Sequence, residues 1–108
     1  MKDFTGLVLC DWHGANVEVH VRADLKNGAL TFSGQDLGPY VEKVWGDTDY
    51  EYWYSLDKEN TRKLFSVIHG EEEPEAALLR EFSGEDGCKA LRRTCDRNGI
   101  WYGFHSYA

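Results

Sequence analysis

The sequence has no long apolar run, no recognisable catalytic signature and few basic residues, and each absence excludes a class of protein. No apolar stretch approaches the roughly 20 residues that a membrane-spanning helix needs. Residues 1–15 contain no basic start followed by an apolar core and a small-residue cleavage site. The sequence therefore predicts a cytoplasmic protein that makes no membrane contact.

Nothing in the chain matches a known catalytic or metal-binding pattern. It contains no G-x-S-x-G, H-E-x-x-H, G-x-G-x-x-G or P-loop sequence. Cys88 and Cys95 lie two helical turns apart, about 10 Å, which is too far for both thiolates to bind one zinc ion. Three cysteines, an odd number without an export signal, favour free buried thiols in a reducing compartment. We expect no catalytic residue, no metal and no cofactor.

Acidic residues outnumber basic ones, 19 to 12, and give a net charge of -7. This charge disfavours binding to nucleic acid or to an anionic membrane, and it suits a positively charged protein partner. Lys89, Arg92, Arg93 and Arg97 recur at helical spacing, but no aromatic residue interrupts this basic stripe for base stacking. We interpret the stripe as a solvated helix face that pairs with the acidic run Glu71–Glu75.

The length of 108 residues fits one domain. Aromatic residues form 14% of the chain. Because each of them buries a large area, a short chain rich in them builds a core without a metal or disulfides. The sequence contains no internal repeat, low-complexity tract or linker, so it predicts a single domain over residues 1–108.

Three strands are predicted in the first third of the chain. Phe4–Trp12 is apolar and β-prone, and residues 17–25 alternate apolar and polar side chains as a half-buried strand does. Asn27-Gly28 then predicts a type I′ hairpin turn, because both residues accept a positive φ. A returning strand follows, and Gly34 is predicted to end it.

The remaining residues predict helices between two further strands. Asp36 is positioned to cap a short helix that Gly46 ends, and Asp57 or Asn60 to cap the helix after the strand Asp47–Asp57. The elements predicted after these are a helix that opens at Pro74 and breaks at Gly84, a last helix over Asp86–Asn98 and a closing strand over Ile100–Tyr107. The order βββαβαααβ indicates an α+β fold, with an antiparallel or mixed sheet of about five strands and three to four helices on one face.

Two stretches of the chain resemble a family of small, acidic bacterial proteins. The first is Leu30–Gly38, with the sequence L-T-F-S-G-Q-D-L-G, and the second is Gly46–Trp53, with the sequence G-D-T-D-Y-E-Y-W. The likeness extends through Asn60–Ile68 to the aromatic tail Ile100–Tyr107, and it is weakest over Phe4–Trp12. It implies a bacterial origin and a shared fold. The family has no established activity, so the resemblance implies no catalytic residue.

Asp47, Asp49 and Glu51 place three carboxylates at alternate positions, where they could converge on a hard cation such as Ca²⁺. An EF-hand loop needs glycine at its sixth position, and Tyr52 stands there instead. The sequence therefore favours a solvated turn that leads into a strand over a metal site.

A small hydrolase or metal-dependent enzyme built on His20, His105 and nearby acids is an alternative, since general acid–base chemistry needs little more. His20 is expected on the polar face of its strand, where an exposed histidine is common. His105 and Ser106 are neighbours on a strand, so their side chains point to opposite faces and do not form a nucleophile–base pair directly. Binding is favoured over catalysis.

The surplus of aromatic residues in the last two predicted strands is the best indication of a binding surface. Tyr and Trp occur on both sides of each strand, whereas a sheet with helices on one side has only one core face. Either the sheet is covered on both faces, or some of these residues are exposed beside acidic neighbours, as in a hot spot for a basic partner. The residues predicted for this protein-binding surface are Asp47, Asp49, Glu51, Trp53, Trp101 and Tyr107.

The sequence thus favours a protein-binding domain, in particular an immunity-type or antitoxin-type inhibitor that covers a basic toxin domain. Small size, negative charge and the lack of catalytic groups motivate this hypothesis. Two alternatives stay open: the His/Asp-dependent enzyme, and a structural subunit that forms homo-oligomers through its aromatic strands.

Overall fold

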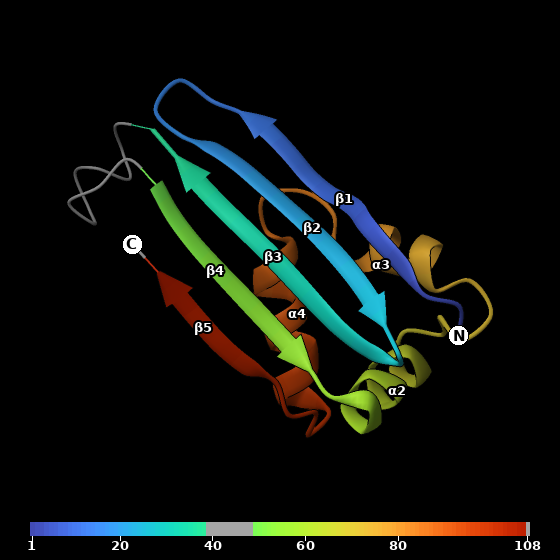
Figure 1. Ribbon diagram of the computed structural model, residues 1–108. Coiled ribbons are helices and arrows are strands. Elements are labelled where there is room, and N and C mark those ends of the chain that lie inside the picture. The colour runs from blue at the N-terminus through green and yellow to red at the C-terminus, as the bar shows by residue number, and fades with distance from the viewer. Residues whose placement is uncertain (39–48, 108) are drawn as a thin grey trace.

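The structure, a computed structural model, describes residues 1–38 and 49–107. In this part, five antiparallel strands form one sheet in sequence order, and three helices pack against one of its faces (Figure 1). The elements are β1 Phe4–His13, β2 Glu18–Lys26, β3 Ala29–Leu37, β4 Asp49–Leu56, α2 Lys58–Val67, α3 Pro74–Phe82, α4 Gly87–Arg97 and β5 Gly103–Tyr107.

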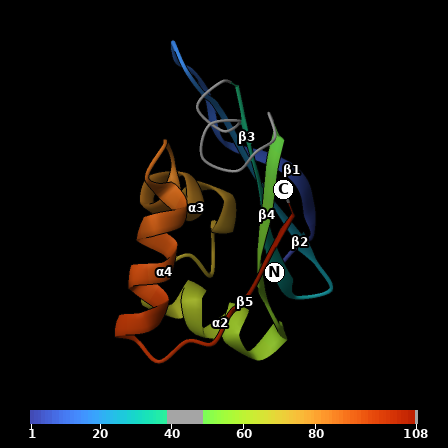
Figure 2. The ribbon, with the colours of Figure 1, turned by 90° about the vertical axis from the view of Figure 1, so that its left-hand side faces the viewer.

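The two-layer arrangement confirms the predicted α+β fold. Seen edge-on in Figure 2, the sheet has α2, α3 and α4 on one side and no described helix on the other. Most of the helix predicted between β3 and β4 falls in residues 39–48, outside the described residues. None of the described helices is long and apolar enough to cross a membrane. The helix layer therefore leaves one face of the sheet without a cover in the described part of the chain.

The β2–β3 hairpin forms where Asn27-Gly28 predicted it. Asn27 has a φ of 52° and Gly28 a φ of 83°, the left-handed values that a type I′ turn requires. The turn pairs Lys26 with Ala29 and so fixes every other pair along the two strands. Because cross-strand partners point to the same face, this register decides which side chains of β2 and β3 lie together.

The prediction that Gly34 ends the third strand is wrong. β3 continues to Leu37, and Gly34 pairs with Val21 of β2 and Tyr52 of β4. A Cβ atom at position 34 would lie 2.1 Å from Tyr52 Cε2, so glycine here makes room for the tyrosine ring. Asp36, predicted to cap a helix, lies within the strand and accepts a hydrogen bond from the Tyr52 hydroxyl at 3.2 Å.

The core lies between the helix layer and the adjoining face of the sheet. Alternate residues of each strand enter it, because successive side chains of a strand point to opposite faces. Phe32 of β3 and Phe82 of α3 pack edge to face with ring centroids 5.8 Å apart. The fully buried Phe and Leu side chains are Leu25, Leu30, Phe32, Leu56, Leu64, Phe65, Leu78, Phe82 and Leu91. Strands and helices from most of the described chain therefore share one core.

The helix boundaries follow the predicted caps. Asp57 precedes α2, and its carboxylate accepts a hydrogen bond from the Asn60 N–H at 2.8 Å. Pro74 lies in the first turn of α3, where the missing N–H costs no hydrogen bond. After α4, Gly99 has a φ of 62° and supplies the left-handed stop.

β5 is shorter than predicted and begins at Gly103 instead of Ile100. Ile100 is buried in the core, and the Trp101 N–H donates a hydrogen bond to Asn60 Oδ1 at 2.8 Å. Asn60 belongs to α2, so Ile100 and Trp101 are held by the helix layer before the chain joins the sheet.

The three cysteines are free, as predicted. Burial raises the pKa of Cys88 to about 12 and the pKa of Cys95 to about 11. Both side chains are therefore protonated thiols at neutral pH and poor nucleophiles.

The pairing predicted between the basic stripe of α4 and Glu71–Glu75 is wrong. In the part of the chain that the structure describes, Lys and Arg side chains form ion pairs only between Lys63 and Glu59 and between Arg80 and Glu81. Exposed Lys and Arg side chains gain little from a single ion pair and lose rotamer freedom in forming it. The stripe is therefore a solvated face without the predicted acidic partner.

Candidate functional site

The face of the sheet opposite the helices, here called the open face, carries polar and aromatic side chains in rows. Strand pairing fixes these rows, because residues directly opposite each other on neighbouring strands point to the same face. One row, from β1 to β5, contains Asp11, His20, Gln35, Glu51 and Tyr107. The adjacent row contains Val8, Arg22, Ser33, Trp53 and His105.

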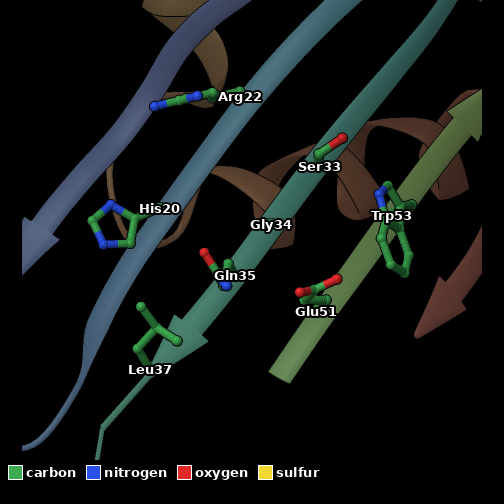
Figure 3. Close-up of a pocket in the computed structure, with 8 residues that line it drawn as sticks. All are labelled: His20, Arg22, Ser33, Gly34, Gln35, Leu37, Glu51 and Trp53. Carbon is green, nitrogen blue, oxygen red and sulfur yellow. The ribbon is translucent and has the colours of Figure 1, made fainter. Parts of the chain in front are cut away.

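A depression of about 420 Å³ lies in the middle of the open face. Figure 3 shows its side chains rising from β2, β3 and β4, with the His20 imidazole on one side and the Trp53 indole on the other. Gln35 between them donates a hydrogen bond from Nε2 to Asp49 Oδ1 at 3.1 Å. The lining residues are His20, Arg22, Ser33, Gly34, Gln35, Leu37, Glu51 and Trp53.

Two histidines and two carboxylates form a cluster at the β1–β2 side of the open face. His20 Nδ1 lies 2.7 Å from Asp11 Oδ1, and His20 Nε2 lies 3.5 Å from Glu18 Oε2. His13 contacts the same two carboxylates, at 3.2 Å from Glu18 Oε1 and 3.5 Å from Asp11 Oδ1. Each imidazole therefore lies between two carboxylates.

The arrangement of this cluster suits hydrogen bonding better than metal binding. Among residues 1–38 and 49–107, no three His, Cys, Asp or Glu side chains are placed to hold one metal ion. Both nitrogens of each histidine already face carboxylate oxygens, so the donor atoms do not converge on one point. Of the carboxylates considered for Ca²⁺, Asp49 and Glu51 lie on β4, and Asp47 lies outside the described residues.

Replacing both His13 and His20 by alanine should raise the pKa of Glu18 toward that of an ordinary glutamate. Hydrogen bonds from the two imidazoles lower the pKa of Glu18 in the folded protein. Such a carboxylate stabilises the fold above its unfolded pKa, and this stabilisation is lost as the pH falls through its folded pKa. NMR titration of the Glu18 side chain in both proteins measures the shift. The same pKa in both would show that these hydrogen bonds do not form in solution.

The side of the open face next to β5 is aromatic. Trp53 and His105 are cross-strand partners whose ring centroids lie 5.6 Å apart. Tyr107 is 72% exposed and Trp101 is 62% exposed. Trp101 precedes the strand, and its ring lies 3.5 Å from the position of a Cβ atom at Gly103, on the side to which His105 and Tyr107 point. This region therefore offers large aromatic area to a partner.

Four of the residues predicted for a binding surface point to the open face, namely Asp49, Glu51, Trp53 and Tyr107. Trp101 borders the same face, and Asp47 lies outside the described residues. The structure thus brings the described members of the predicted set to one side of the sheet.

The aromatic residues of β4 point alternately to the two faces of the sheet. Tyr54 is buried in the core, and Tyr52 is partly buried against it. Trp53, between them, lies on the open face. Phe104 of β5 points to the helix side with Tyr54, yet it remains 52% exposed. Of the two alternatives derived from the sequence, the described residues support exposed aromatic side chains beside acidic ones.

Most polar residues that the first three strands contribute to the open face were not predicted as site residues. The sequence could have predicted which residues of β2 and β3 face each other, because the Asn27-Gly28 turn fixes the register of these two strands. That register places Arg22 opposite Ser33 and His20 opposite Gln35. The missed residues are Asp11, His13, Glu18, Arg22, Ser33 and Gln35.

One side chain in the depression, His20, is of the type that acts as a general base. Held by Asp11 at 2.7 Å, it could accept a proton. Both of its nitrogens face carboxylates, and within the described ranges no hydroxyl or thiol hydrogen-bonds to either one. The nucleophile–base pair that covalent catalysis needs is therefore not formed by these residues.

No protein-family model, curated protein or solved structure matches the chain significantly. The resemblance to a family of small bacterial proteins stays a prediction.

Proposed function

We propose that this protein binds a positively charged protein through the open face of its sheet. The observation that carries the proposal is a sheet face that the described helices leave uncovered (Figure 2). This face bears the exposed aromatic side chain of Tyr107 and, at its border, that of Trp101. Antiparallel sheets commonly leave one face in water, but that face is then mainly polar. A cluster of exposed Trp and Tyr side chains on it is typical of a surface that contacts another protein.

The charge of the open face supports a basic partner. An excess of carboxylates over cations steers a positively charged surface toward it and disfavours acidic partners. By strand register, the charged residues that the described strands place on this face are the acids Asp11, Glu18, Asp24, Asp49 and Glu51 and the bases Arg22 and Lys26.

Trp53 and Tyr107 supply the aromatic anchors, since Trp and Tyr dominate measured binding energies at protein interfaces. The depression beside Trp53 is large enough for one side chain of the partner. A lysine or arginine entering it would meet the Glu51 carboxylate and the Trp53 indole on β4, both of which attract a cation, while Arg22 lies across β3 on β2. This combination favours a basic side chain at the centre of the interface.

Within this class, we favour an immunity-type inhibitor that covers a basic toxin domain. A chain of 108 residues with a net charge of -7 and no catalytic signature suits this role. An inhibitor that acts by occlusion needs only a complementary surface, so neither a cofactor nor a reactive side chain is required.

Changing both Asp49 and Glu51 to lysine should weaken partner binding by at least about 100-fold, because like charges placed across an interface cost several kcal/mol. The tagged wild-type chain captures the partner from a lysate of its source cells at moderate salt. The purified partner is then titrated with the wild-type chain and with the variant, and calorimetry measures the affinity.

The matched control changes Glu72 and Glu75 to lysine, which alters the net charge equally but lies in the helix layer, before and at the start of α3. This variant should bind within a few-fold of the wild-type chain. An equal loss of affinity in both variants would show that net charge, and not the open face, determines binding. Capture of no basic partner at all would contradict the proposed function.

A small hydrolase that uses His20 is the second candidate, and one observation favours it. His20 lies in the depression and is held by Asp11 at 2.7 Å, as a general base is held by an orienting carboxylate. A panel of ester and phosphoester substrates distinguishes the two candidates. Turnover that disappears in the His20→Ala variant would favour the enzyme, whereas unchanged partner affinity in the same variant would favour binding.

A further inference from the structure

Within the described ranges, the outer edge of β5 is free for strand pairing. β5 is the last strand of the sheet order β1-β2-β3-β4-β5, so within the described residues only β4 pairs with it (Figure 1). An edge strand presents a row of backbone N–H and C=O groups that another strand can pair with. Phe104 and Tyr107 of this strand are 52% and 72% exposed. The edge therefore combines open hydrogen-bonding groups with exposed aromatic side chains.

The opposite edge of the sheet, β1, is protected in ways that β5 is not. The register of β1 shifts between Phe4 and Leu7 and again between Val8 and Cys10, as bulges do. Its Leu9 carbonyl accepts a hydrogen bond from the Gly84 N–H at 2.9 Å, so the chain after α3 covers part of this edge. β5, by contrast, has a continuous register with β4.

The sequence of β5 also lacks the residues that normally prevent edge pairing. Gly103–Tyr107 reads G-F-H-S-Y and contains no proline, lysine, arginine, aspartate or glutamate. Natural sheets protect their edges with such residues, with bulges or with a covering segment. None of these protections is present on β5 in the described part of the protein.

We propose that β5 pairs antiparallel with β5 of a second copy of this chain, about a two-fold axis at His105, so that the two sheets become one. The basic partner proposed above finds its carboxylates on β1, β2 and β4, and Tyr107 is an exposed residue that both surfaces share. Because the two-fold axis is perpendicular to the sheet, both open faces would lie on the same side of the dimer.

The register about His105 is self-complementary. It places Phe104 opposite Ser106 and Gly103 opposite Tyr107 in both directions. A Tyr107 ring would then lie beside Gly103 of the other copy and the Trp101 ring that borders it, as aromatic residues pack against glycine in sheets. The same device already occurs within the fold, where the Tyr52 ring lies over Gly34. On the helix side, the two Phe104 rings become diagonal neighbours and lose exposure.

The absence of charged side chains from β5 limits the repulsion between two acidic copies at this edge. Each copy carries a net charge of -7, so two copies approach most easily through a segment without charged residues, which β5 provides. A basic extended peptide would find no carboxylate on β5 to pair with. The uncharged, self-complementary strand therefore fits a copy of itself.

Opposite charges at position 105 give a direct test. In the proposed dimer the two position-105 side chains face each other at about 5 Å between Cβ atoms. His105→Lys and His105→Glu should each weaken dimerisation at least about tenfold, because each places two like charges together. An equimolar mixture of the two variants should restore the dimer as a heterodimer. Sedimentation equilibrium of the full chain measures the mass, expected to be twice 12.4 kDa for the wild-type dimer.

The matched controls are His69→Lys and His69→Glu, at an exposed histidine that lies just after α2, away from the sheet. They should leave the dimer unchanged. A wild-type chain that stays monomeric at millimolar concentration would overturn the inference. Unchanged dimerisation of both His105 variants, or a mixture of the two that forms no heterodimer, would also overturn it. The Asp49→Lys, Glu51→Lys variant should remain dimeric, so loss of partner binding and loss of the dimer are distinguishable.

Discussion

Replacing Gly34 by alanine should destabilise the protein by about 2 to 3 kcal/mol, the upper part of the range expected when a side chain is forced into filled space. The new Cβ atom would lie 2.1 Å from Cε2 and 2.2 Å from Cζ of Tyr52, far inside van der Waals contact. The tyrosine ring has little freedom to move away. Its hydroxyl donates to Asp36, and its ring contacts those of Tyr50 and Tyr54 at centroid distances of 5.5 and 6.2 Å.

A double-mutant cycle with Tyr52→Ala identifies the ring as the cause. Urea denaturation should show that Gly34→Ala costs at least about 1.5 kcal/mol less when Tyr52 is already alanine, because neighbouring residues that share space couple strongly. Ser33→Ala, one residue away on the open face, is the matched control and should change stability by less than about 0.5 kcal/mol. An equal cost of Gly34→Ala in both backgrounds would place the strain in the β3 backbone and contradict the steric explanation.

The same contact explains why the sequence predicts β2 fully and β3 only in part. The Asn27-Gly28 turn is a local signal, so the hairpin and its register follow from neighbouring residues. Judged from neighbouring residues alone, a glycine at position 34 predicts the end of a strand. Its actual role is to make room for the ring of Tyr52, which is distant in the sequence. No local signal fixes the register between β3 and β4, because these strands are not joined by a tight turn.

β1 shows a second limit of reasoning from periodicity. A bulge inserts a residue that has no partner, and every later side chain then points to the other face. Leu9 and Cys10 are both buried although they are adjacent in the strand, because the register shifts between Val8 and Cys10. The contacts of Asp11 with His20 depend on this shift, so alternation alone could not place the histidine–carboxylate cluster.

The aromatic side of the open face was easier to predict. Strict alternation holds along β4, so Asp49, Glu51 and Trp53 had to share one face. Which face the helices would cover could be decided only by packing. Burial of Tyr54 and Leu56 at the alternate positions decides it in favour of an open face that carries the acids and the tryptophan.

Replacing Thr61 by valine should destabilise the protein by about 2 to 4 kcal/mol, because it leaves two buried backbone groups without a partner. The Thr61 hydroxyl accepts a hydrogen bond from the Leu30 N–H at 3.0 Å and donates one to the Leu56 carbonyl at 3.1 Å. Thr61 itself is fully buried on α2, so water does not replace the lost hydroxyl. Valine has almost the same shape, so the cost measures the hydrogen bonds.

Thr61→Ser is the matched control, since serine keeps the hydroxyl and removes only a methyl group. It should cost about 1 kcal/mol, the usual cost of one buried methyl. Hydrogen exchange tests the hydrogen bond separately from overall stability. After correction for global unfolding, the Leu30 amide should exchange faster in Thr61→Val than in the wild-type chain, and at the wild-type rate in Thr61→Ser. Leu30, at the start of β3, and Leu56, at the end of β4, are cross-strand partners, so this hydroxyl ties α2 to strands that carry the open face. Equal stability and equal Leu30 exchange in the two variants would show that packing, and not the hydroxyl, joins the helix layer to the sheet.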